Sequence, residues 1–212
     1  MFENGTFAVL GPDGKQVQCD VLFTYDCEDN GRSYVVFTTG EGAQQQLFAN
    51  RYAAREDGQP ALFPLENEQE YQIIKHCFEE LKAKLADGLV VVCRRHNAKD
   101  SEGKTYPYLM ELYQYIEQNA DLCHVLLGKN GDIAFTDRIC HILRDEFLYD
   151  FLAYYYPNDP AMLDYFCSFI VSGNMSLALT WIAGGMKQTA EEMAVLAGEI
   201  IMHGVKVLET KA

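Results

Sequence analysis

The sequence predicts an α+β protein, in which a small antiparallel β-meander with one helix is followed by an all-helical bundle. Up to residue 66, short runs of β-branched and aromatic residues are separated by turn sequences, a pattern typical of antiparallel strands. From residue 67 onward, apolar residues recur at three- and four-residue spacings, as one buried face of a helix requires. Because the two patterns do not alternate, we expect the sheet and the bundle to form separate parts.

The predicted strands lie in short apolar runs between turns. The clearest turn is Asn30-Gly31, which lies between two runs of β-branched and aromatic residues and is a hairpin signature. A second turn sequence occupies residues 11–14. The runs are residues 7–10, a run from Val17, and residues 21–25, 34–38, 46–49 and 61–63.

One helix is predicted directly after these strands. Asn67 and Glu70 have the spacing of a capping box, and Asp87-Gly88 is the predicted helix end. The apolar face is formed by Tyr71, Ile74, Cys77, Phe78, Leu81 and Leu85. Because a lone hairpin sheet is marginally stable in water, we expect this helix to cover the apolar face of the sheet.

These boundaries divide the chain into three segments. Residues 1–88 are the predicted meander with its helix, residues 89–105 a linker, and residues 106–212 an all-helical domain. Residues 89–93 fit either a short strand or a helix end. Helix starts in the last segment are predicted at the N-cap Asp132, at Asp159-Pro160, and at the capping box of Thr189 and Glu192.

Two helices of the last segment are apolar on more than one side. Residues 165–186 are 22 residues without a charge, and the final helix carries two adjacent apolar stripes. Since a helix that is apolar nearly all round must be covered on both sides, we predict a homodimer that pairs through these two helices. A monomeric bundle in which both helices are central is the alternative. The predicted interface residues are Gly173, Leu177, Met193, Ala197, Ile200, Ile201 and Gly204.

Composition argues against two kinds of partner. A net charge of −14 repels phosphate backbones, so we expect no direct nucleic-acid binding. Residues 165–186 are interrupted by serine, threonine and asparagine and lack a basic flank, so we expect no membrane span. The start of the sequence has no signal-peptide pattern, and seven irregularly spaced cysteines suit buried thiols in a reducing compartment. The protein is therefore expected to be cytoplasmic.

The sequence contains no motif of a known catalytic or cofactor chemistry. A P-loop, G-x-S-x-G, G-x-G-x-x-G and H-E-x-x-H are all absent. Neighbouring helical residues point about 100° apart and chelate a metal poorly. This applies to the three Cys/His neighbours, which are His76-Cys77, Cys123-His124 and Cys140-His141. We expect no catalytic residue, no metal and no cofactor, and an enzyme with a sequence-scattered site is the alternative.

Several distinctive residues at fixed spacings in the C-terminal half form a further sequence pattern. They are Leu112 to Ile116 with Asn119, His124 to Leu127 with Gly131 and Phe135, Tyr165, Phe169 and Gly173, Trp181, Ile182 and Gly185, and Glu192 with Met193. With their apolar surroundings, over residues 106–208, they resemble the C-terminal ligand-binding and dimerisation domain of tetracycline-repressor-type (TetR) transcription regulators.

The resemblance implies a helical core with a small-molecule pocket and dimerisation through the last two helices. Regulators of that type begin with a helix-turn-helix, whereas nothing helical is predicted before Asn67, so the resemblance does not extend to operator binding. His141 is the polar residue of the implied pocket, which needs a few polar groups among apolar walls. The implied ligand-binding residues are Tyr113, Phe135, His141, Phe147, Phe166, Phe169 and Trp181.

The N-terminal half resembles a second family. Residues 20–25, 33–37 and 65–71 are similar to the bacterial domain of unknown function 1292, which implies a fold and no activity. We therefore predict a non-catalytic regulatory protein, a homodimer that senses a small apolar molecule or a protein partner. The alternative is a modulator that heterodimerises with a full-length TetR-type regulator and withholds it from DNA.

Overall fold

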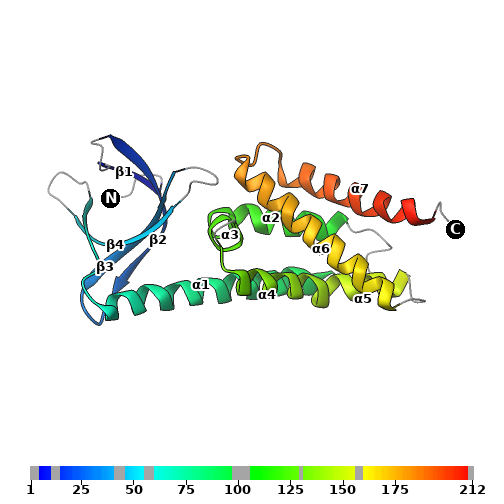
Figure 1. The fold of residues 1–212 in the computed structure, drawn as a ribbon, viewed down its shortest axis with the longest axis horizontal. Helices are drawn as coiled ribbons and strands as arrows, with labels where there is room; N and C mark the ends of the chain where they lie inside the picture. Colours follow the sequence, from blue (N-terminus) through cyan, green and yellow to red (C-terminus); the bar gives the residue numbers. More distant parts are fainter. Residues whose placement is uncertain are drawn as a thin grey trace. The chain divides into compact units, whose positions relative to one another are not determined.

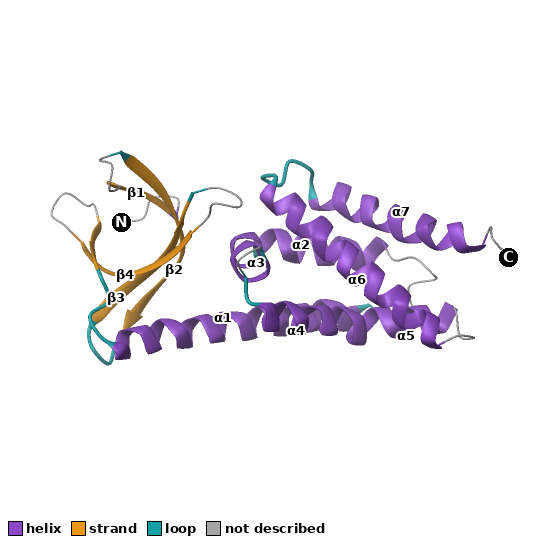
Figure 2. Ribbon diagram, in the orientation of Figure 1, coloured by secondary structure: helices purple, strands orange, loops and turns teal. Residues whose placement is uncertain are grey.

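The structure is a computed structural model that describes residues 5–10, 15–40, 46–54, 60–96, 106–128, 131–155 and 160–209. It divides into two compact units, Met1–Leu81 and Lys82–Ala212. Strands come first along the chain and helices follow (Figure 1 and Figure 2). The predicted α+β class is thus confirmed. The predicted domain boundary at residue 88 lies inside a helix that continues across the division between the units.

The N-terminal unit contains the predicted antiparallel meander. Each strand pairs with the next one along the chain, and the sheet order is β1-β2-β3-β4-β5. The strands are β1 Thr6–Leu10, β2 Gln16–Cys27, β3 Arg32–Thr39, β4 Gln46–Ala54 and β5 Pro60–Phe63. The register pairs Cys27 with Arg32 at the end of the β2–β3 hairpin.

The β2–β3 turn has the geometry that Asn30-Gly31 predicts. Gly31 adopts a φ of 66°, a left-handed conformation that glycine tolerates without a steric penalty, and its amide donates to the Cys27 carbonyl at 2.9 Å. The Asn30 carboxamide accepts from the Arg32 amide and donates to the Tyr34 hydroxyl. The turn therefore sets the register of both strands.

Strand β3 is buried on both faces of the sheet. One face contributes Val35 and Phe37 to a cluster with Phe7 and Cys19. The opposite face contributes Tyr34 and Val36 to a second cluster, which includes Cys27 and Ile74. Because Ile74 belongs to the helix α1, this helix covers one face of the sheet, as expected.

Helix α1, Glu68–Arg95, begins where the sequence predicts. The Asn67 carboxamide oxygen accepts from the Glu70 amide at 3.0 Å, so Asn67 caps the helix. Two expectations about this helix were wrong. Tyr71 lies outside the buried face, with 57% of its surface exposed, and the helix continues beyond Gly88 through the buried residues Leu89 and Cys93. Residues 97–105 of the predicted linker lie outside the described residues.

Gly88 serves close packing rather than helix termination. Tyr115, on helix α2 (Tyr106–Gln118), donates its hydroxyl to the Leu85 carbonyl of α1 at 2.9 Å. A Cβ atom at Gly88 would lie 2.8 Å from Cζ and 2.9 Å from Cε2 of Tyr115, which is closer than carbon atoms pack. Glycine at position 88 therefore allows the tyrosine ring to cross α1.

We expect Gly88→Ala to destabilise the helical unit by about 1–3 kcal/mol, because overpacking outweighs the helix propensity that alanine adds. Urea denaturation followed by Trp181 fluorescence measures this loss. In a Tyr115→Leu background the ring is gone, and the same glycine replacement should be neutral or stabilising. An equal loss in both backgrounds would contradict the packing role.

The C-terminal unit is helical throughout its described elements. After α2 come α3 Ala120–Leu127, α4 Ile133–Leu143, the π-helical turn η3 Arg144–Leu148, α5 Tyr149–Tyr155, α6 Pro160–Ala183 and α7 Ala190–Glu209. The Asp132 carboxylate accepts from the Phe135 amide, and Thr189 and Glu192 cap α7 reciprocally, so both predicted caps are confirmed. Pro160 is the first residue of α6, while Asp159 lies outside the described residues.

Ion pairs connect the C-terminal part of α1 to its neighbours in this unit. Lys82 contacts Asp132 at 2.7 Å, and Arg94 contacts Glu146 at 2.7 Å in a bidentate pair. Arg95 pairs with a carboxylate on α2. The two adjacent arginines of the sequence are therefore neutralised on the helix.

Candidate ligand-binding groove and pairing surface

Helices α6 and α7 expose apolar side chains on the side that faces away from their own core. Tyr165 and Phe169 on α6 have 74% and 72% of their surface exposed. Toward the core, the same helix buries Leu163, Cys167 and Ile170. The exposed apolar residues form what we call the outer face, and they are Met162, Tyr165, Phe169, Val195, Leu196, Ile200 and Met202. The two-sided apolar character read from the sequence is present in the structure.

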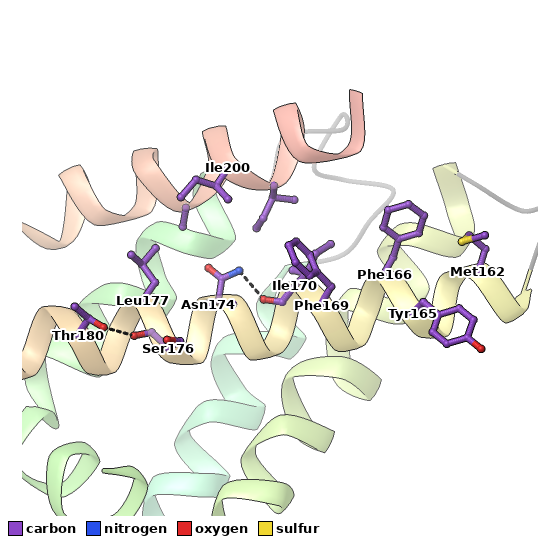
Figure 3. Close-up of a pocket in the computed structure, with 13 residues that line it drawn as sticks. Met162, Tyr165, Phe166, Phe169, Ile170, Asn174, Ser176, Leu177, Thr180 and Ile200 are labelled. Atoms are coloured by element: carbon purple, nitrogen blue, oxygen red, sulfur yellow. Dashed lines mark hydrogen bonds between the residues drawn. The ribbon is translucent and has the colours of Figure 1, made fainter. Parts of the chain in front are cut away.

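A groove of about 630 Å³ lies between α6 and α7. In Figure 3, Leu177 from α6 and Ile200 from α7 point toward each other across it, and Phe166 extends along the same side of α6. Most of the polar lining comes from Asn174, Ser176 and Thr180 on α6. The Thr180 hydroxyl donates to the Ser176 carbonyl at 2.8 Å, so it is satisfied within the helix. The groove is a mainly apolar surface open to solvent.

The structure places most of the predicted interface residues on this groove. Gly173, Leu177, Ala197, Ile200 and Ile201 line it. Met193, also on α7, is buried and lies outside the groove lining. Gly204 lies in α7. Five residues selected from two helical stripes therefore come together on one surface.

The predicted ligand-binding residues do not surround one cavity. Phe166 and Phe169 line the groove. His141 is exposed on α4, where it lies 3.8 Å from Asp145. The remaining residues are buried in the helical core and are Tyr113, Phe135, Phe147 and Trp181.

Three aromatic contacts pack the rings of three of these core residues against their neighbours. Tyr113 and Trp181 meet edge to face, with ring centroids 5.7 Å apart. Phe147 stacks on Tyr108 at 3.8 Å and on Phe151 at 5.4 Å. Their rings are used largely in packing one another, as buried aromatic pairs usually are.

Sequence reasoning missed Asn174, a half-buried residue of α6. Its side chain lines the groove and two small interior cavities of about 50 and 40 Å³. Its amide nitrogen donates to the Ile170 carbonyl at 2.9 Å, while its buried oxygen has no hydrogen-bond partner within the described part of the chain. The available signal was a carboxamide inside an uncharged helical stretch, where each polar group needs a reason.

The cysteines of the described residues are all unpaired, and only Cys140 is partly accessible. Burial raises the pKa of Cys93 to about 11, and burial raises the pKa of Cys123 to about 12. These thiols are therefore protonated near neutral pH and unsuited to nucleophilic chemistry. His76 and His141, which adjoin cysteines in sequence, are exposed. In the described ranges, no three His, Cys, Asp or Glu side chains are grouped closely enough to hold a metal.

One helix of the described chain, over Met162–Ala183, is long and apolar enough to cross a membrane by length and composition. Its most apolar window is 33% buried within the unit. Core helices of water-soluble proteins meet the same criterion, so the observation is weak evidence for a membrane span.

The fold defines a two-part protein, with a small sheet unit followed by a helical unit. Residues 103–203 match the family described as Transcriptional regulator C-terminal region, and residues 13–83 match Protein of unknown function (DUF1292). Through this N-terminal part, the chain belongs to the UPF0473 family. Both resemblances read from the sequence are thus confirmed.

The relatives are proteins about as long as the N-terminal part alone. UPF0473 protein YrzB of Bacillus subtilis is 31% identical over 83 residues, which cover 37% of this chain and 86% of the relative. A UPF0473 protein of Listeria monocytogenes is 33% identical over 89 residues, covering 40% and 86% respectively. One from Bacillus thuringiensis is 30% identical over 84 residues, covering 37% and 91%. No solved structure matches the chain.

Proposed function

We propose that this protein is a non-catalytic regulator that acts as a homodimer, paired through the outer face of α6 and α7. The observation that carries the proposal is the exposure of large apolar side chains on both helices, led by Tyr165 and Phe169. The match to a transcriptional regulator C-terminal region supports a regulatory role.

Covering the outer face with a second copy would be strongly favourable. Fully burying one large apolar side chain contributes about 1.5–3 kcal/mol, and a two-fold axis uses each residue twice. No charge occurs between residues 165 and 186, so pairing on this part of α6 buries no charged side chain of that stretch. Large exposed apolar patches usually mark such interfaces.

The proposal does not include operator binding by this chain alone. The described elements before α1 are the strands of a sheet, and the net charge is −14. Regulation would therefore proceed through a small apolar molecule in the groove, and a full-length TetR-type regulator in place of the second copy is the alternative. Unpaired cysteines suit a reducing compartment, so we place the protein in the cytoplasm.

Multi-angle light scattering of the intact chain, at about 10–50 μM, tests the pairing. We expect a particle of twice the chain mass of 24.0 kDa. A particle of 24.0 kDa across this range would remove the homodimer. If the chain alone is a monomer, mixing it with a full-length TetR-type regulator tests the modulator alternative, which requires a mixed particle.

A further inference from the structure

The groove and the two interior cavities meet at one side chain. Asn174 lines all three, and Ile170 and Ile201 are shared between the groove and the cavity of about 40 Å³. Leu112 and Leu143 are shared between the two interior cavities. The groove and the two interior cavities therefore share part of their lining, with Asn174 common to all three.

Two buried polar atoms lie at this inner end without a partner. Tyr113 and Asn174 both line the cavity of about 50 Å³, and neither the Tyr113 hydroxyl nor the Asn174 oxygen makes a hydrogen bond with the described residues. Tyr113 is fully enclosed, with 1% of its surface exposed. A native protein seldom leaves such atoms unsatisfied, because their desolvation is not repaid. They therefore indicate a missing hydrogen-bonding group.

The two atoms require a group that both accepts and donates a hydrogen bond. The Tyr113 hydroxyl can donate, and the Asn174 oxygen can only accept. A hydroxyl group satisfies both at once, whereas an ether oxygen can only accept. A cavity of about 50 Å³ has room for a hydroxymethyl group or for one water molecule.

We propose that the helical unit binds an uncharged alcohol with a hydrocarbon body. Its hydroxyl is held between Tyr113 and Asn174, and its hydrocarbon lies in the inner part of the groove between α6 and α7, beside Ile170 and Ile201, beneath the outer face that the second copy covers. This rests on the proposed ligand-sensing function and specifies its ligand class. A groove of about 630 Å³ lies within the size range of small-molecule sites. Among the described residues that line the three spaces, none is charged, so a carboxylate or an ammonium group would be left unpaired.

Trp181 reports on the inner end of the site. It is the single tryptophan of the chain, and its ring contacts that of Tyr113. The probes are 1-octanol, heptyl methyl ether, which has similar size but no donor, and octanoate at pH 8. We expect octanol to change Trp181 emission saturably and to bind about tenfold more tightly than the ether, the worth of one hydrogen bond. Octanoate is expected to cause no saturable change.

Two variants separate the hydroxyl contact from the apolar contacts. Asn174→Leu has an apolar side chain of similar size, and it should weaken octanol binding about tenfold while leaving the ether unchanged. Tyr113→Phe should weaken octanol in the same way. Ser172→Ala is the matched control, since Ser172 is an exposed residue of α6 outside the lining, and it should change neither probe.

Equal affinities for octanol and the ether would overturn the proposal, as would octanol binding that Asn174→Leu leaves unchanged. Either result means that the two atoms hold water only. Light scattering on the same samples keeps the two proposals apart. A dimer that binds no probe removes the alcohol site and retains the pairing, whereas a monomer that binds octanol selectively removes the pairing and retains the site.

Discussion

Replacing Glu70 with alanine is expected to destabilise the N-terminal unit by about 2–4 kcal/mol, because it takes a buried, charged acceptor away from several hydrogen-bond donors. Only 1% of the Glu70 surface is exposed. Its carboxylate accepts from the Arg32 guanidinium at 2.5 Å, from the Tyr34 hydroxyl at 3.2 Å and from the Glu66 amide at 2.5 Å. Alanine removes this acceptor from all three donors, and the Arg32 guanidinium keeps its contact with the Glu66 carboxylate at 3.1 Å.

Hydrogen exchange of the β3 amides, measured by mass spectrometry, checks this loss where it occurs. We expect protection in β3 to fall steeply in Glu70→Ala and the helical unit to keep its protection. Glu68→Ala is the matched control, because Glu68 is an exposed acid in the same first turn of α1 and should cost less than about 0.5 kcal/mol. Similar losses of β3 protection in the two variants would contradict a special role for the hydrogen bonds of the Glu70 carboxylate.

The same carboxylate makes stability depend on pH. Burial alone raises the pKa of Glu70, but hydrogen bonds from the Glu66 amide, Arg32 and Tyr34 outweigh burial and lower this pKa below its ordinary value of 4.5. A lowered pKa in the folded state gives stability that is complete above pH 4.5 and is lost as the pH falls through the folded pKa. We expect β3 protection to decline in this acidic range, and Glu70→Gln to lack that part of the decline.

Replacing Phe169 with glutamate is expected to weaken pairing by a factor of about 100 or more. Phe169 has 72% of its surface exposed in the single chain and lies in the uncharged stretch of α6. In the proposed dimer, the new carboxylate would be buried among apolar groups, and the two-fold axis introduces it twice. Sedimentation equilibrium at several concentrations measures the change in the dimer dissociation constant.

Ile133→Glu is the control for this variant. Ile133 is even more exposed, at 79%, but it lies at the start of α4 and outside the outer face. A carboxylate at a helix start is favourable, so this variant should fold and keep the wild-type dissociation constant. If both variants associate alike, then the apolar exposure on α6 and α7 has another cause than pairing.

Local signals in the sequence predicted the elements well. Asn30-Gly31 acts within one turn, and Asn67, Asp132 and Thr189 each cap a helix through an atom at most three residues away. Such interactions depend on neighbouring residues and can be read without knowledge of the fold. Gly88 is the instructive error, because a glycine that reads as a helix end is required there by a tyrosine 27 residues later in the chain.

Contacts between residues far apart in the sequence were less predictable, both around Glu70 and in the groove. Glu70 reads as a capping residue, and only the fold brings Arg32 and Tyr34 against it. The two-sided pattern of α6 and α7 correctly indicated an exposed apolar surface. Pattern alone could not separate core rings such as Phe147 from groove residues such as Phe166, since both lie in helical stretches rich in apolar residues and only the packing distinguishes them.

The rate at which the buried cysteines become chemically modified reports on the unfolding of each unit separately. Cys19, Cys27 and Cys77 are buried in the N-terminal unit, and Cys93, Cys123 and Cys167 in the helical unit. A disulfide-forming dye reacts with the deprotonated sulfur and needs physical access to it. Modification at each sulfur, resolved by peptide mass, would therefore show how often the sheet and the bundle unfold and whether they do so together.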